Sequence, residues 1–178
     1  EKIIVSVMAG VTVEELRRQT GAVKIVRTMP NTPAMLGEGM TCISYSNEVT
    51  EVEKEVVRKL FLSVGRIEEI PEKLLNAAIC ANGSSPAFVY LFMEALADGV
   101  VKYGIPRDMA YRLVGQTVLG SAKMLLESGQ HPGKLKDAVC SPGGTTIAGV
   151  AALEEYGLRN AVIKAADACY KKAEEMQK

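Results

Sequence analysis

The stretch "RIEEIPEKLLNAAICA", Arg66 to Ala81, is where the sequence changes from one kind of pattern to another. Before Pro71, short β-rich runs alternate with helical patterns, as in the layered α/β class of domains. After Pro71 the strand signals cease, and apolar residues recur at helical spacing almost to the end of the chain. We therefore predict an α/β layer over residues 1–71, followed by an all-α helical domain over residues 72–178.

The first part carries two helix-start signals and two helix-stop signals. Thr12 and Thr50 each precede a glutamate by three positions, which is the spacing of a capping box, so we expect a helix to begin at each. Gly21 and Gly65 are expected to end those helices. Strands are expected at residues 2–7, 24–28, 41–46 and 66–70, with a loop rich in proline and glycine at residues 28–39.

The second part is expected to be helical throughout. Ser84 or Ser85 is expected to cap a helix that has Pro86 in its first turn, where the missing N–H costs nothing. That helix, "PAFVYLFMEALADGVVKYG", is apolar nearly all round, so we expect it to be buried against a second chain in an obligate dimer. Helices are expected at about residues 72–81, 86–103, 107–128, 146–156 and 158–175.

The composition indicates a small-molecule or self-association partner. The chain has 178 residues, 48% of them hydrophobic, and its 21 basic residues balance 21 acidic ones without a long run of either sign. That balance argues against a nucleic-acid or acidic-membrane surface. Because the sequence lacks an apolar run of about 20 residues and the order of a signal peptide, a cytoplasmic location is predicted.

The cysteines and the histidine point to no metal site. Cys42, Cys80, Cys140 and Cys169 lie far apart, without a CxxC pair or a histidine at ligand spacing, so reduced thiols are expected and no metal is predicted. Cys140 stands just before a predicted helix, which can lower a thiol pKa, although packing is the preferred interpretation. His131 lies in "GQHPGK", where a surface turn is expected.

Two loops in the first part are candidates for ligand binding. "VMAGVT", Val7 to Thr12, follows the first predicted strand, and ligands of open α/β sheets bind at the carboxyl ends of strands. A plain strand-to-helix turn is the alternative, and on these residues alone it is preferred. "TMPNTPAMLGEG", Thr28 to Gly39, sets two prolines and two glycines around Asn31, and a ligand loop and a structural loop are equally compatible with it.

The third candidate is "CSPGGTT", Cys140 to Thr146. A helix that begins near Thr146 offers free backbone N–H groups and the positive end of its dipole, which favour a carboxylate or a phosphate. The adjacent glycines allow an anion to come close to the backbone. A simple N-cap role for Thr146 is the alternative.

Taken together, these loops resemble those of one enzyme family. "VMAGVT", "RTMPNTPA", "NGSSPAFVYLFMEALADG" and "GQTVLGSAKMLLESGQHPGKLKDAVCSPGGTTIAGVAALE", with the spacing between them, are similar to pyrroline-5-carboxylate reductase. The resemblance spans essentially the whole chain. Family members begin with a strand and a GxGxxG phosphate loop, which this sequence does not contain, so we expect it to correspond to the C-terminal two-thirds, with residues 1–71 completing a Rossmann domain. Truncation is the favoured explanation, and a first part that is present in the protein but outside this sequence is the alternative.

The resemblance implies an activity and a set of site residues. It implies hydride transfer from NADPH, or NADH, to the C=N bond of 1-pyrroline-5-carboxylate, giving L-proline, in a homodimer formed through the helical domain, with larger assemblies open. Thr146 is implied to hydrogen-bond the ring nitrogen as the catalytic residue. The substrate carboxylate is implied to bind the backbone of Gly143, Gly144 and Thr145, with Ser141 supporting the loop. Cofactor contacts are implied for Val7, Met8, Ala9, Pro30, Asn31, Glu72 and Pro86.

Two alternatives remain open at this point. A 3-hydroxyacid or 6-phosphogluconate type of dehydrogenase shares the layout but uses a lysine on the first long helix of its second domain, and residues 86–101 contain none. The second alternative is that the chain by itself is a catalytically inactive dimerisation and substrate-binding fragment. It would then have an exposed sheet edge where further strands are missing. "NGSSPAF" also departs from the family's usual SGSGPAY at Ser85 and Phe88, which bears on the cofactor side of the site.

Overall fold

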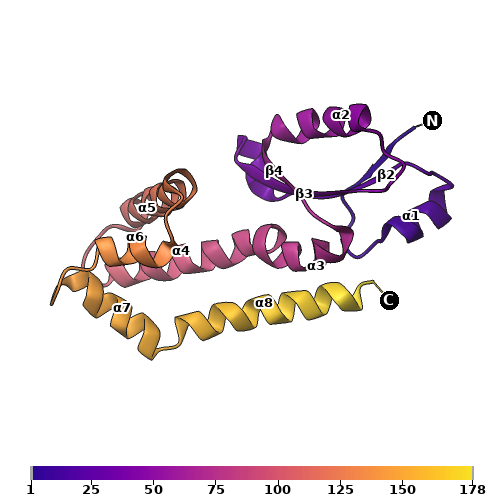
Figure 1. Ribbon diagram of the computed structural model, residues 1–178. Coiled ribbons are helices and arrows are strands. Elements are labelled where there is room, and N and C mark those ends of the chain that lie inside the picture. Colours follow the sequence, from indigo (N-terminus) through magenta and orange to yellow (C-terminus); the bar gives the residue numbers. More distant parts are fainter. Residues whose placement is uncertain (1, 178) are drawn as a thin grey trace. The chain divides into compact units, whose positions relative to one another are not determined.

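The computed structural model describes residues 2–177, so the outermost residues of the two predicted domains, Glu1 and Lys178, lie outside the described part. An α/β layer is followed by helices, as the sequence predicts (Figure 1). The chain forms two compact units, residues 1–87 with 164–178, and residues 88–163. The last segment of the chain thus belongs with the first unit, and the boundary at residue 71 stays a prediction.

The first unit is built on a mixed sheet with strand order β1-β2-β3-β4. β1 and β2 are parallel, with Ser6 opposite Arg27; β2 and β3 are antiparallel, with Met29 opposite Cys42; β3 and β4 are parallel. The carboxyl ends of β1 and β2 therefore lie at the same end of the sheet, next to the start of β3. The strands are β1 (Ile4–Ser6), β2 (Ile25–Met29), β3 (Gly39–Tyr45) and β4 (Gly65–Glu69).

Helices cover both faces of this sheet (Figure 1). Helix α2 (Glu51–Leu62) lies on one face, where Val57 and Phe61 pack against Val26 and Ile43. On the other face a run of three short helical segments and the end of the last helix contribute to a second core, made of Met29, Cys42, Leu75, Ile79 and Ala173. Helix α1 (Val13–Thr20) connects β1 to β2.

The second unit packs two long helices, α4 (Ser85–Val101) and α5 (Arg107–Ser128), around Ala97, Ala110 and Val114. The remaining helices are α6 (Pro132–Ala138), α7 (Thr145–Glu155) and α8 (Leu158–Glu175). Within residues 2–177, no helix is both long and apolar enough to cross a membrane.

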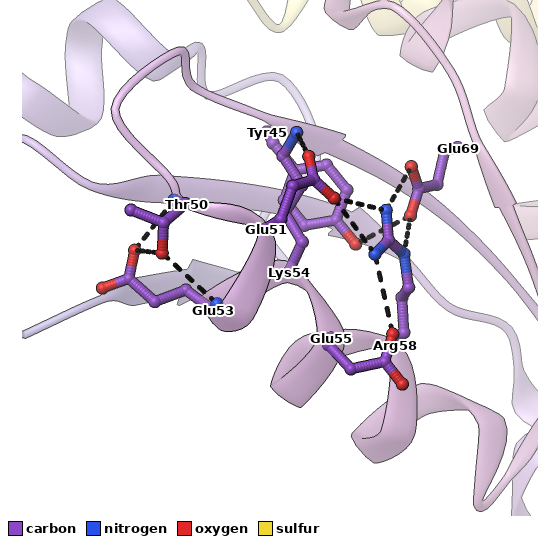
Figure 2. A network of polar contacts seen from close by, with 8 residues as sticks. All are labelled: Tyr45, Thr50, Glu51, Glu53, Lys54, Glu55, Arg58 and Glu69. Atoms are coloured by element: carbon purple, nitrogen blue, oxygen red, sulfur yellow. Dashed lines mark hydrogen bonds and ion pairs between the residues drawn. The ribbon is translucent and has the colours of Figure 1, made fainter.

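Several predicted helix ends are confirmed. α5 and α8 have the predicted bounds, and α1 ends at Gly21 in the left-handed conformation. Thr50 forms the predicted capping box, since its hydroxyl accepts from the Glu53 N–H and the Glu53 carboxylate accepts from the Thr50 N–H. Figure 2 shows this box beside the ion pairs of Arg58 with Glu51, Glu55 and Glu69.

Other predicted ends are wrong. Thr12 caps α1, but the Glu15 carboxylate binds Arg18 and Gln19 instead of completing a capping box. α2 ends at Leu62 with Ser63 as its C-cap, and Gly65 opens β4 instead of stopping the helix. The strand predicted at residues 2–7 is shorter, because only Ile4–Ser6 pair with β2.

Three segments differ from the sequence-based expectation in kind. The helix predicted at 72–81 is a run of η2 (Glu72–Leu74), α3 (Leu75–Ala78) and the π-helix η3 (Ile79–Gly83). This run continues directly into α4, so neither Ser84 nor Ser85 caps a helix there. Ser84 has helical dihedral angles, and the Ser85 hydroxyl donates to the Ala81 carbonyl. The loop predicted at 28–39 contains a 3-10 helix, η1 (Thr32–Leu36).

The capping box supports a pH-dependence prediction. Hydrogen bonds from Lys24 and then Thr50 lower the pKa of Glu53 to about 2. Because this pKa is lower in the folded state than in the unfolded state, ionised Glu53 stabilises the fold above about pH 4.5, and this contribution is lost as the pH falls towards 2. Glu53→Gln is therefore expected to show a smaller drop in urea midpoint between pH 6 and pH 2.5 than wild type. Glu55→Gln, on the same helix, is the control, and equal drops in Glu53→Gln and wild type would contradict the prediction.

Candidate functional site

The first group of site residues lies at the carboxyl ends of β1 and β2. Val7, Met8 and Ala9 follow β1 directly, and all three are exposed. Pro30 and Asn31 follow β2. Because these strands are adjacent and parallel, the structure brings the two loops together at one end of the sheet. This is where open α/β sheets bind ligands.

Asn31 is tied into the start of the next strand. Its Oδ1 accepts from the Met40 N–H at 3.0 Å, and its backbone precedes η1 without a side-chain cap. The loop between β2 and β3 is thus held by its own asparagine. The loop was equally compatible with a ligand loop and a structural loop. The structure shows a structural contact for Asn31, and its cofactor contact stays a prediction.

Glu72 has partners within the first unit. Its Oε1 accepts from the Val13 N–H at 2.7 Å and from Arg27 Nη1 at 2.9 Å. The Arg27 side chain is 2% exposed, and its Nε has no hydrogen-bond partner among residues 2–177. Glu72 therefore neutralises a buried guanidinium and binds the start of α1, which is a structural role beside the predicted cofactor contact.

Two polar residues near this site were missed from the sequence. Arg27 lies in the middle of a strand whose five residues are all buried, and a buried charge needs a partner, so its position alone was a usable signal. Asn82 is buried in η3, and its Nδ2 donates to the Met29 and Met40 carbonyls. No periodicity in the sequence distinguishes Asn82 from an exposed helical asparagine. Pro86, the last predicted cofactor residue, lies one turn further on, inside α4.

The second group of site residues, in the second unit, surrounds the start of α7. The Gly144 N–H donates to the Ser141 carbonyl at 3.1 Å, and Gly143 has a φ of 67°, so residues 141–144 form a tight turn that favours glycine. A Cβ on Gly144 would collide with Ser141 Oγ. The positive φ of Gly143 favours glycine there, whereas Gly144 has an ordinary extended φ and its closest neighbour is a side-chain hydroxyl that can rotate.

The turn leaves the start of α7 accessible. Gly144, and not Thr146, is the N-cap, so the alternative interpretation of Thr146 as a simple N-cap is wrong. The first helical hydrogen bond runs from the Ala148 N–H to the Gly144 carbonyl at 3.3 Å. The N–H groups of Thr145 and Thr146 lie ahead of that ladder, and both residues are exposed. This arrangement suits a small anion.

The thiols and the histidine lie outside these two groups. Residues 2–177 contain Cys42, Cys80, Cys140 and Cys169 as free cysteines. Burial raises the pKa of Cys80 to about 11, which keeps this thiol protonated at neutral pH. His131 is exposed, and its Nδ1 caps α6 by accepting from the Gly133 N–H, so a helix begins where only a turn was predicted.

Comparison with known proteins shows the family. The fold defines a two-part class of protein, in which an α/β unit built on a mixed sheet is joined to a helical unit, and this layout alone does not assign a function. Residues 72–176 match the family model described as pyrroline-5-carboxylate reductase dimerisation. The chain belongs to the pyrroline-5-carboxylate reductase family, as the sequence motifs predict.

Curated relatives and solved structures agree with this assignment. The chain is 48% identical to pyrroline-5-carboxylate reductase of Escherichia coli (strain K12) and 45% identical to that of Pisum sativum. The alignments cover 100% and 99% of the chain but 66% and 64% of those relatives, so the chain spans just under two thirds of their length. The Plasmodium falciparum enzyme, solved with NADP bound, has 38% identity and a TM-score of 0.93, covering 99% of this chain and 72% of that one.

Proposed function

We propose that the protein containing this chain transfers a hydride from NADPH, or NADH, to the C=N bond of 1-pyrroline-5-carboxylate, giving L-proline in the cytoplasm. The observation that carries the proposal is the start of α7, where a turn that favours glycine leaves backbone N–H groups open beside two threonine hydroxyls. In a member of this family, such a site suits a small cyclic acid with one carboxylate and one ring nitrogen.

In this proposal the substrate is held by α7 and the turn before it. The backbone N–H groups of Gly143 and Thr145 bind the carboxylate, and the helix dipole favours its negative charge. The Gly144 N–H, also predicted for this role, already donates to the Ser141 carbonyl. The Thr146 hydroxyl hydrogen-bonds the ring nitrogen and orients the C=N bond. Because an imine nitrogen is readily protonated, the site needs to position the ring and exclude water more than it needs a strong acid.

The cofactor is assigned to the sheet end of the first unit. Val7, Met8 and Ala9 are exposed there, and Pro30 and Asn31 lie on the neighbouring loop, so these residues fit a dinucleotide. The dinucleotide supplies the hydride. Glu72 and Pro86 are proposed to support this region from η2 and α4. Glu72 does so through Arg27 and Val13.

The first experiment measures the intact mass of the purified protein and then NADPH oxidation with pyrroline-5-carboxylate in the same sample. A mass above that of the 178 residues, together with activity, supports the reductase. A mass equal to that of the 178 residues, without activity, makes the isolated chain an inactive dimerisation and substrate-binding fragment. Activity with a 3-hydroxyacid but not with the imine would favour the dehydrogenase alternative.

A homodimer through the helical region is part of the same proposal. Helix α4, all of whose residues are described, buries Ala97 alone, while Val89, Leu91, Phe92 and Leu96 stay 39–67% exposed. An apolar face of this kind marks an interaction site. The match of residues 72–176 to a dimerisation model favours a second copy of the chain as its partner.

Phe92→Asp or Leu96→Asp is expected to convert the dimer to monomer, because each places an unpaired charge where apolar contact stabilises association. The mass by light scattering is then expected to halve. Val52→Asp on α2 is the control, since Val52 is 78% exposed and lies outside the matched region. A dimer that survives both α4 changes would exclude this face as the interface.

A further inference from the structure

Asn82 forms hydrogen bonds to both ends of the loop between β2 and β3. Its side chain is buried, at 6% exposure, within the π-helix η3. Its Nδ2 donates to the carbonyl of Met29 at 2.7 Å and to that of Met40 at 3.1 Å. Met29 is the last residue of β2 and Met40 is the second residue of β3. One amide group therefore fixes the distance between the two ends of the segment that contains Pro30 and Asn31.

Met40 is held by two asparagines. Its N–H donates to Asn31 Oδ1 and its carbonyl accepts from Asn82 Nδ2. The preceding N–H, that of Gly39, donates to the Val64 carbonyl at 2.9 Å. The end of the loop is thus defined by three polar contacts from three parts of the first unit. Through Asn82, one of these contacts comes from the helical run that continues into α4.

The amide of Asn82 is well suited to setting position and poorly suited to adding stability. Only its NH2 group can face two carbonyls, so its orientation is defined. Its Oδ1 is then buried with no hydrogen-bond partner among residues 2–177. A buried acceptor left unpaired offsets much of what the donated bonds contribute. π-helical turns of this kind are also frequent at functional sites.

We infer that Asn82 is a positioning residue for the nicotinamide dinucleotide. It acts through the loop and does not itself contact the cofactor. By fixing the Met29 and Met40 carbonyls, it holds Pro30 and Asn31 in the conformation that receives the nicotinamide end. This inference rests on the proposed function, which assigns Pro30 and Asn31 to that end of the cofactor. It adds a residue from the helical run to the determinants of cofactor affinity.

The test measures the Kd of NADPH by isothermal titration calorimetry, using protein produced from the complete reading frame. Asn82→Ala is expected to raise this Kd about tenfold, because the loop then samples conformations that do not receive the ring. Asn82→Ser keeps one donor, so it is expected to recover part of the affinity, with a Kd about threefold above wild type. The KM of the imine substrate is expected to stay within twofold of wild type in both variants.

Asn76→Ala is the matched control. Asn76 is 7% exposed and belongs to the same helical run, but its Oδ1 accepts from Gln177 Nε2 at 3.1 Å and not from the loop. If the role of Asn82 is purely structural, Asn82→Ala and Asn76→Ala will both lower the melting temperature, and both will leave the Kd of NADPH unchanged. That result would overturn the inference. If Asn82→Ala does not fold, an unchanged Kd in Asn82→Ser overturns it instead.

The outcomes also separate this inference from the proposed function. If wild type binds NADPH but does not reduce the imine, the proposed reaction fails, and the Kd values still decide the role of Asn82. If wild type turns over and Asn82→Ala binds NADPH as tightly as wild type does, only the role of Asn82 is excluded. Wild type that does not bind NADPH contradicts both.

Discussion

Thr146→Ala, in protein expressed from the complete reading frame, is expected to lower kcat by about 10- to 100-fold. This is the usual cost of losing one hydrogen bond that strengthens in the transition state. The Thr146 hydroxyl lies in the first turn of α7, beside the tight turn at Gly143 and Gly144. Its side chain is exposed and is not used as the N-cap, so its loss leaves the helix start intact.

Its neighbour provides the control for this experiment. Thr145→Ala is expected to leave kcat within about twofold, because only the backbone N–H of Thr145 is assigned to the substrate. Thr146→Ser retains a hydroxyl and is expected to restore most of the rate. The measurement is the steady-state rate of NADPH oxidation at saturating imine. A Thr146→Ala enzyme with the wild-type rate would remove Thr146 from the mechanism.

Glu72→Ala is expected to destabilise the first unit by about 3 kcal/mol. Removing one partner of a buried ion pair typically costs about 3–5 kcal/mol, because it leaves a buried charge unpaired. The lower figure applies here because the Glu72 side chain is 37% exposed while that of Arg27 is 2% exposed. The same change removes the hydrogen bond to the Val13 N–H at the start of α1.

Urea denaturation followed by circular dichroism measures this effect. Glu14→Ala on α1 is the control, since Glu14 is exposed, and it is expected to change stability by less than about 0.5 kcal/mol. The double variant Arg27→Met with Glu72→Ala is expected to recover much of the loss, because no buried charge then remains. A Glu72→Ala protein of full stability with weakened NADPH binding would instead assign Glu72 to the cofactor.

Much of the fold could be predicted from the sequence, because helix starts and ends depend on neighbouring residues. The capping box at Thr50 and the left-handed Gly21 at the end of α1 act within a few residues, so the sequence contains the whole cause of each. The boundary between η3 and α4 could not be predicted from the sequence. Ser84 and Pro86 have the local pattern of a helix start, but the backbone there continues a helix that packs on the sheet through Leu75 and Ile79. Tertiary packing overrode the local signal.

In the candidate site, too, the local features were predicted and the long-range contacts were not. The sharp bend at Gly143 is local, and the pair of glycines predicted it from the residues alone. The contacts of Glu72 with Arg27 and of Asn82 with Met29 join positions 45 and 53 residues apart. No periodicity or motif indicates which buried polar groups will meet at such separations. The family resemblance placed Glu72 near the site but did not indicate what its carboxylate binds.

The return of the chain's last helix to the first unit has a consequence for biosynthesis. Ala173 is part of the core with Met29 and Leu75, and the Met176 backbone lies against Gly10. That core therefore lacks Ala173 until the last turns of α8 have been translated and have left the exit tunnel. The α2 face of the sheet has no such requirement, since its core lies within residues 3–67. The two faces of one sheet are thus completed at different times during synthesis, with the face that carries Asn82 and Glu72 completed last.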